Sequence, residues 1–328
     1  MKMSRSAFWL AAFLAGSILA GCSKDDVAGT DDDQGTAPVG VNNETEAMKY
    51  YAAQDEFVKN DEATFTDDEM QPTDYGTFGK IDAAITPLRW GRFVSTVTTN
   101  ITVTVQTGDS LAIAHVEKTI EGTFRVRGIN ETNDTVMVEK PFTDVSTRNV
   151  IFKRVRRDVR RYWLNWLPVA SSLVDGGTIP PNNTIDITQL QLFLPNGDTL
   201  TITDPNNYYF RYRWTYLFTG GRKDVPELTP NQRVVMQATV VSAHADTDLV
   251  ALRYGVGTFQ KRRMRMTLVS ETFDPGTQLY TRIYQTPFLV HAHRGFFTAG
   301  VDAVSHETLF DDEAPYAVSW WGVPYRVF

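Results

Sequence analysis

The sequence predicts a mainly β protein whose body is an antiparallel, β-sandwich-like (Ig-like) fold. From about residue 81 onward β-branched residues are abundant, and segments such as Val94–Val105 alternate between apolar and polar side chains. Turn signals separate such segments at intervals of about 8–12 residues, which is typical of sandwiches and barrels. We therefore expect two β units that meet near residue 168, a first unit over residues 76–168 and a second, sandwich-like unit over residues 169–328.

Turn residues predict the individual strands. Thr184–Leu194 and Thr199–Thr203 flank Asn196-Gly197, a strong hairpin signal that requires positive φ at both turn positions. Tyr208–Phe218 places aromatic residues on alternate positions and predicts a further strand.

The segment Val150–Trp166 combines a strand-like start with helical spacing of its later apolar residues. We expect a strand to Val155, a turn, and a second strand through Trp163 and Leu167. Six basic residues lie within Lys153–Arg161. They predict either a solvated strand face or a site for an acidic partner, which would be an anionic surface glycan or the acidic leader of this chain.

Charge is distributed unevenly along the 328 residues, whose net charge is -7. Residues 23–75 contain fifteen acidic residues and three lysines, so the remaining body is close to neutral. A near-neutral body argues against nucleic acid as a partner, because nucleic acid requires a strong basic field. The single cysteine, Cys22, excludes an intrachain disulfide.

The first 22 residues have the pattern of a signal peptide. Lys2 and Arg5 precede the apolar segment Ala7–Leu19, which is shorter than the roughly 20 residues of a transmembrane helix. It ends in Leu19-Ala20-Gly21-Cys22, which resembles the lipobox of bacterial lipoproteins. The resemblance implies that residues 1–21 are removed. It also implies that Cys22 carries diacylglycerol and an N-acyl chain such as palmitate, which would anchor the chain in a lipid bilayer.

The residues after Cys22 indicate the location of the protein. Ser23-Lys24-Asp25-Asp26 resembles the export signal of surface lipoproteins in the Bacteroidota, which implies the outer membrane and the cell surface. Residues 22–44 have few apolar side chains, and we expect a flexible acidic tether with an r.m.s. span of about 25 Å. Residues 45–75 predict a short helix, which Asn43 caps, followed by an acidic linker.

The only local histidine pair is His291-Ala292-His293. On a strand, these two side chains would share a face about 6.6 Å apart, and His306 or Asp302 would be a third metal ligand. Two histidines without a third ligand nearby in the sequence are only weak evidence for a metal site. We therefore expect no metal, and no cofactor besides the lipid on Cys22.

The other acidic and nucleophilic residues do not form a catalytic motif. Asp246-Thr247-Asp248 and Asp311-Asp312-Glu313 are rich in oxygen, but neither matches the twelve-residue calcium loop, and turn capping also explains them. The chain has no Gly-x-Ser-x-Gly sequence and no glycine-rich phosphate loop. We therefore assign no catalytic residue.

Three tryptophans, Trp163, Trp320 and Trp321, are candidates for stacking on a sugar, although packing in the core is the alternative.

Together, the sequence features favour a non-catalytic outer-membrane lipoprotein with a structural or ligand-binding role and with a glycan or a protein as partner. One alternative is a metal- or carboxylate-dependent surface hydrolase that acts on glycans. Another is an assembly partner of an outer-membrane complex.

Overall fold

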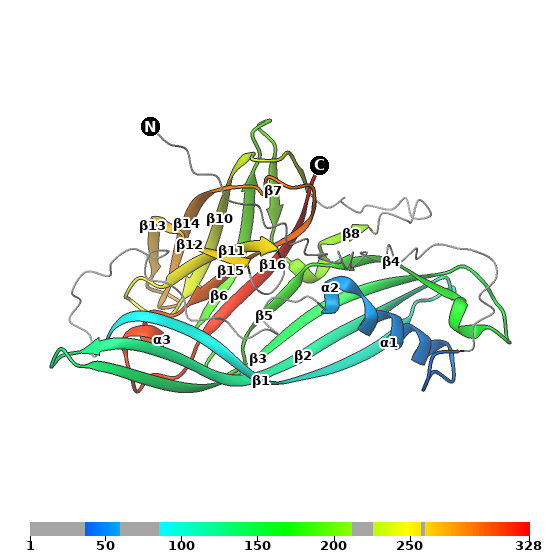
Figure 1. Ribbon diagram of the computed structural model, residues 1–328, viewed down its shortest axis with the longest axis horizontal. Helices are drawn as coiled ribbons and strands as arrows, with labels where there is room; N and C mark the ends of the chain where they lie inside the picture. The colour runs from blue at the N-terminus through cyan, green and yellow to red at the C-terminus, as the bar shows by residue number, and fades with distance from the viewer. Residues whose placement is uncertain (1–36, 60–84, 212–225, 257–259) are drawn as a thin grey trace, which may run out of the picture. The chain divides into compact units, whose positions relative to one another are not determined.

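A computed structural model describes residues 37–59, 85–211, 226–256 and 260–328 (Figure 1). The described chain is mainly β, and its strands pair antiparallel with the exception of β9 and β16, which pair in parallel. This confirms the fold class that the sequence predicts. The helices are short: α1 (Glu44–Gln54), α2 (Glu56–Lys59) and α3 (His306–Phe310), with 3-10 turns η3 (Tyr162–Leu164) and η4 (Pro205–Asn207).

The larger sheet has the strand order β1-β2-β3-β5-β16-β15-β11-β12. Three further strands join it at its sides, because β4 pairs with β3 and β8, and β9 pairs with β16. The bounds are β1 (Ile85–Val105), β2 (Leu111–Asn130), β3 (Thr135–Arg154), β4 (Trp166–Ser172), β5 (Val174–Thr178), β8 (Tyr209–Arg211), β9 (Glu227–Leu228), β11 (Leu249–Val256), β12 (Gln260–Arg265), β15 (Gly295–Val304) and β16 (Val318–Val327).

The smaller sheet has the order β13-β14-β10-β6-β7. Its bounds are β6 (Ile185–Phe193), β7 (Thr199–Ile202), β10 (Arg233–Ser242), β13 (Thr267–Asp274) and β14 (Leu279–Leu289). Burial alternates strictly along β10, as expected for a strand with one face on a core. Its inward residues pack with those of β11, β15 and β16 in one hydrophobic cluster, so the two sheets form a sandwich.

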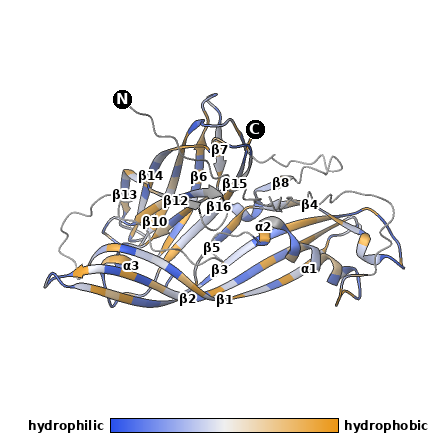
Figure 2. Ribbon diagram, in the orientation of Figure 1, coloured by the Kyte–Doolittle hydropathy of each residue, from blue (hydrophilic) through white to orange (hydrophobic). Residues whose placement is uncertain are grey.

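Strands β1, β2 and β3 are about 20 residues long and run side by side, with α1 across them near one end (Figure 1). Figure 2 shows hydrophobic and hydrophilic residues interleaved along them. Met48 and Ala52 of α1 bury Ala114 and Phe152 there. A second cluster, which includes Trp90 and the α3 residues Leu309 and Phe310, covers another part of these strands.

The N-terminal helix begins where its cap predicts. The Asn43 side chain accepts a hydrogen bond from the Glu46 amide at 2.9 Å, which satisfies one of the unpaired donors of the first turn. The hairpin between β6 and β7 also forms where expected. Only one of its two turn residues has positive φ, because Gly197 has φ 88° and Asn196 is not in that region. The expectation of positive φ at both positions was wrong.

The segment after β3 also differs from the expectation. Strand β3 ends at Arg154, and Tyr162–Leu164 form a 3-10 turn where we expected a strand through Trp163. The buried Asn165 side chain explains the difference, because it accepts from the Asp158 amide at 2.8 Å and donates to the Asp158 carbonyl at 3.2 Å. These hydrogen bonds close a loop and replace the pairing of a strand.

The large sheet joins strands from both sides of residue 168. That residue lies inside β4, and β5 pairs with β3 on one side and with β16 on the other. Residues 37–328 cluster as one compact unit. Most of the predicted aromatic strand Tyr208–Phe218 lies outside the described residues, which include Tyr208 and the short strand β8 from it.

Glycines in β5 permit one close contact in the centre of the large sheet. A Cβ atom at Gly176 would lie 2.3 Å from the ring of Trp320, its partner across the strands. The indole therefore lies directly against the β5 backbone, which only a residue without a side chain allows. Among the described residues, no helix has the length and apolar character needed to cross a bilayer.

Candidate functional site

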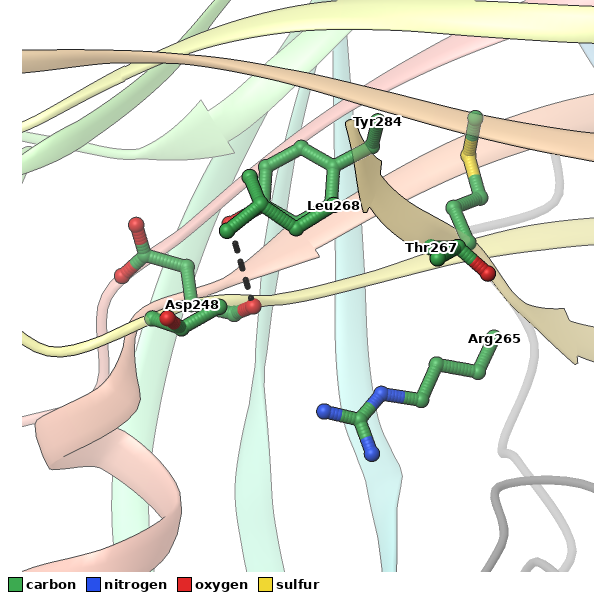
Figure 3. Close-up of a pocket in the computed structure, with 7 residues that line it drawn as sticks. Asp248, Arg265, Thr267, Leu268 and Tyr284 are labelled. Carbon is green, nitrogen blue, oxygen red and sulfur yellow. Dashed lines mark hydrogen bonds between the residues drawn. The ribbon is translucent and has the colours of Figure 1, made fainter. Parts of the chain in front are cut away.

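Polar side chains gather around the loop from Ala243 to Asp248, which connects β10 to β11. A pocket of about 300 Å³ opens beside this loop, where the chain crosses from β12 of the larger sheet to β13 of the smaller one. We call it the sheet-junction pocket (Figure 3). Its lining residues are Thr247, Asp248, Arg265, Met266, Thr267, Leu268 and Tyr284.

Arg282, which lies in β14, holds this loop in its conformation. Its side chain is fully buried, and it donates to the Asp248 carboxylate at 2.6 Å and to the carbonyls of His244 and Ala245 at 2.9 and 2.7 Å. Its Nε atom also binds Glu271 at 2.6 Å. The guanidinium thus holds two loop carbonyls and two acids, which is the fork geometry that suits arginine.

Asp248 lies at the base of the pocket with both carboxylate oxygens bound. One oxygen accepts from Arg282, and the other accepts from the His306 amide at 3.1 Å. Burial raises the pKa of Asp248, and the charge of Arg282 opposes the rise. Because both oxygens already have donors, this carboxylate serves to hold the loop, α3 and β14 together.

Tyr284 closes one side of the pocket. Its hydroxyl donates to the Asp248 carbonyl at 3.2 Å, and Figure 3 shows the ring beside Leu268. Burial raises the pKa of Tyr284 above its usual range, and the Asp248 charge adds to the rise, so the phenol is neutral at physiological pH. Arg265 and Thr267 bring a guanidinium and a hydroxyl to the lining.

Three segments meet at His244. Its Nδ1 atom lies 2.9 Å from the Glu307 carboxylate, and its Nε2 atom lies 2.8 Å from the Thr184 hydroxyl. A protonated Nδ1 that donates to Glu307 leaves Nε2 to accept from Thr184, which is the order of acid, base and hydroxyl in triad hydrolases. The same hydrogen bonds also tie α3, the β10–β11 loop and the start of β6 together.

His306 lies in the first turn of α3, beside the same loop. Its Nδ1 atom is 3.2 Å from the Thr247 carbonyl, and its ring stacks on Phe310 at 4.2 Å. The carbonyl accepts from Nδ1, so this nitrogen carries its proton and does not face a metal.

The expected histidine pair does not lie on a strand. His291 and His293 lie in the turn between β14 and β15, so they do not share a strand face, and that expectation was wrong. His291 Nδ1 is 2.8 Å from the Tyr325 hydroxyl, and its ring stacks on Phe297 at 4.2 Å, whereas His293 is exposed. Within the described residues, no group of three or more His, Cys, Asp or Glu side chains has a metal-binding arrangement.

The candidate tryptophans occupy different environments. Trp320 and Trp321 lie in β16 and are 4% exposed, so their rings pack in the core. Trp163 lies in η3, is half-buried and packs edge-on against Tyr162.

Asp302, the other candidate ligand, belongs to a buried charge cluster in the large sheet. Arg92 donates to Asp302 at 2.6 Å, and Arg253 also binds this carboxylate. The Tyr316 hydroxyl donates to Asp144 at 3.0 Å, and Arg92 lies 3.8 Å from the same acid. Burial raises the pKa of Asp144 to about 6, against the opposing effects of Arg92 and Tyr316.

Sequence reasoning missed both arginine clusters, although one signal was present. Along β14 the inward positions are Arg282, Tyr284, Thr286 and Phe288, so an arginine stands on the apolar face of a strand. A buried arginine requires an acidic partner, and that position therefore predicted an ion pair without naming its acid. The pairing of His244 with Thr184 and Glu307 had no local signal, since 60 residues separate His244 from Thr184.

Comparisons with protein-family models, with curated proteins and with solved structures found no match to this chain.

Proposed function

We propose that this chain is a lipid-anchored lipoprotein of the outer membrane, exposed at the cell surface, whose β body has a non-catalytic ligand-binding role. The observation that carries the anchor is Leu19-Ala20-Gly21-Cys22 after a basic and apolar leader. Cys22 is the single thiol of the chain, so one position accounts for both its presence and its lipidation.

The sheet-junction pocket supports the binding role. Its volume of about 300 Å³ is at the lower end for small-molecule sites, which combine apolar walls with a few directed polar groups. Met266 and Leu268 supply apolar wall, and Arg265 and Thr267 supply hydrogen-bond donors. A small ligand with acceptor oxygens, such as a sugar acid, fits this lining.

The environment of Asp248 favours a binding role for the pocket over a catalytic role. A general base must reach the substrate, but the Asp248 side chain is fully buried and its carboxylate is paired with Arg282 at 2.6 Å. Substitution of Arg265 by Met should weaken binding of a ligand with acceptor oxygens without a change in fold. Titration calorimetry with uronic acids measures this, and an unchanged affinity would refute the pocket assignment.

The anchor is tested in cells with the full chain. We expect Cys22→Ser to abolish incorporation of labelled palmitate, to leave the signal peptide uncleaved and to release the protein from the outer-membrane fraction. Inhibition of the lipoprotein signal peptidase should cause the precursor of the unaltered chain to accumulate. Unchanged size and unchanged membrane association after both treatments would contradict the anchor.

A second candidate is a hydrolase, which the Thr184–His244–Glu307 chain of hydrogen bonds favours. In this case the purified protein should hydrolyse acyl esters, including ester groups on glycans. Thr184→Ala and His244→Ala should each remove nearly all of that activity, because nucleophile and base act as a unit. Turnover that survives both substitutions would exclude this triad.

A further inference from the structure

The connection between β3 and β4 is strongly basic. We call residues Val155–Asn165 the basic loop; it contains four arginines and one aspartate, a net charge of +3. All four arginines are exposed. Two of them have acidic partners, since Arg157 lies 3.3 Å from Asp109 and Arg161 lies 3.1 Å from Asp158. The loop therefore presents an excess of positive charge to its surroundings.

Apolar side chains project from the same loop. Val159 is 91% exposed, Val155 and Leu164 are 41% and 37% exposed, and Leu167 follows in β4 at 38%. Single exposed apolar residues are ordinary on a protein surface. Here four exposed apolar residues lie within thirteen positions, interleaved with arginines and next to the half-buried Trp163. This composition is typical of segments that lie at a membrane interface.

Internal hydrogen bonds hold the loop in this arrangement. The Asn165 carbonyl accepts from the amides of Val155 and Arg156 at 2.8 and 3.3 Å, and the Asp158 carboxylate accepts from the amides of Arg160 and Arg161 at 2.8 and 3.1 Å. These hydrogen bonds satisfy the backbone donors of four loop residues, Val155, Arg156, Arg160 and Arg161. The loop presents its side chains in a formed structure, which lowers the entropic cost of binding.

The loop is fixed to the C-terminal end of the predicted tether, residues 22–44. The Tyr162 hydroxyl donates to the Val41 carbonyl at 2.8 Å, and Asn165 donates to Glu44 at 2.6 Å. Cys22 precedes Val41 by 19 residues, and the sequence predicts an r.m.s. span of about 25 Å for a chain of that length and composition. A bilayer that holds acyl chains on Cys22 is therefore within reach of the loop.

We propose that the basic loop docks on the anionic phosphate headgroups of the membrane in which the chain is anchored. This inference rests on the proposed anchor at Cys22. The exposed arginines bind headgroup phosphates, while Val159, Leu164 and Trp163 enter the boundary between headgroups and acyl chains. Docking at the loop would hold the body against the bilayer, whereas the lipid alone leaves it at the end of a tether.

The test uses residues 23–328, which lack Cys22, so that no acyl chain contributes to binding. All the contacts described lie within residues 37–328, and this truncation removes none of them. We expect co-sedimentation with vesicles of phosphatidylethanolamine and phosphatidylglycerol, much less with phosphatidylcholine vesicles, and a decrease at high salt. Arg156→Gln with Arg160→Gln should weaken binding about 25-fold, at about fivefold per charge.

A matched control removes two exposed arginines elsewhere. Arg233→Gln with Arg294→Gln has the same change of net charge, and we expect at most a twofold effect on vesicle binding. Val159→Ser should weaken binding without altering the salt dependence. Brominated lipid should quench tryptophan emission in the unaltered chain and less so in Trp163→Phe.

Three results would overturn the proposal. They are equal binding to anionic and neutral vesicles, equal losses in the two double variants, and binding of soluble heparin without vesicle sedimentation, which would assign the loop to an anionic glycan. Acylation of Cys22 is measured separately on the full chain. Vesicle binding without acylation in cells would refute only the anchor, and acylation without vesicle binding would refute only the docking surface.

Discussion

Buried arginines are the unusual residues of this chain. Arg92, Arg253 and Arg282 each lie inside a sheet or between the sheets with at least one aspartate as partner. Removal of one partner from such a pair leaves an unpaired buried charge and costs several kcal/mol, whereas an apolar replacement of the whole pair is often neutral. We therefore expect these pairs to determine which strands meet more than to add stability.

Asp144 should make the stability of the protein decrease as pH rises. Burial raises its pKa to about 6 in the folded state, from 3.8 in an ordinary environment. Between these values the folded chain retains a proton that the unfolded chain releases, so rising pH favours unfolding. The free energy of unfolding should fall by up to about 3 kcal/mol over this window.

The comparison of the unaltered chain with Asp144→Asn isolates this effect, because the amide does not titrate. We expect the variant to lose the part of the pH dependence that lies between pH 4 and pH 6 in urea unfolding curves. Parallel curves for the two proteins over that window would show that Asp144 is ionised in the folded state.

At the scale of elements, one residue, Glu44, orients α1 on the large sheet. Glu44 accepts from Trp166 at 2.8 Å, from Asn165 at 2.6 Å and from Arg154 at 3.0 Å, so the first turn is bound to the start of β4 and the end of β3. Burial tends to raise the pKa of Glu44, but these hydrogen bonds outweigh it and lower the pKa. The helix thus packs through Met48 and Ala52 and is oriented by Glu44.

Glu44→Ala should lower the free energy of unfolding by about 2–3 kcal/mol, because the buried Asn165 amide and the Trp166 indole lose their acceptor. Protease cleavage near residue 50 should also become faster. Glu46→Ala is the matched control in the same turn. Its exposed ion pair with Lys49 at 3.2 Å is worth less than about 1 kcal/mol. Equal losses in the two variants would contradict the anchoring role.

At the scale of the whole molecule, the large sheet connects the two halves of the sequence. Strand β5 pairs with β3, which precedes residue 168, and with β16 at the C-terminus. The smaller sheet then packs against β11, β15 and β16 of that same sheet. Loss of β16 would expose the core of the sandwich and free one side of β5, so neither half keeps its core alone.

Residues 37–328 should therefore unfold in a single cooperative step, although the sequence predicts two β units. Tryptophan emission and far-UV circular dichroism should give coincident transitions in urea. Two separate fragments, residues 37–168 and 169–328, should each be largely unfolded. Two resolved transitions, or a folded C-terminal fragment, would instead support a unit boundary near residue 168.

The sequence by itself determined the features that depend on neighbouring residues. Alternation of apolar residues predicted strands such as β10, Asn43 predicted the start of α1, and Gly197 predicted the β6–β7 turn. It also supplies the whole argument for lipidation at Cys22, which lies outside the described residues. Side-chain period, capping and turn conformation are set within a few residues, and a local pattern is enough to predict them.

Only the tertiary structure decided which distant side chains meet. Arg92 binds Asp302 across 210 positions, His244 binds Thr184 across 60, and Asn165 turns a predicted strand into a closed loop. A buried charge or amide requires a partner, but its type alone does not say which segment supplies that partner. Strand pairing selects the partner, because it brings β1, β3 and β15 into one sheet.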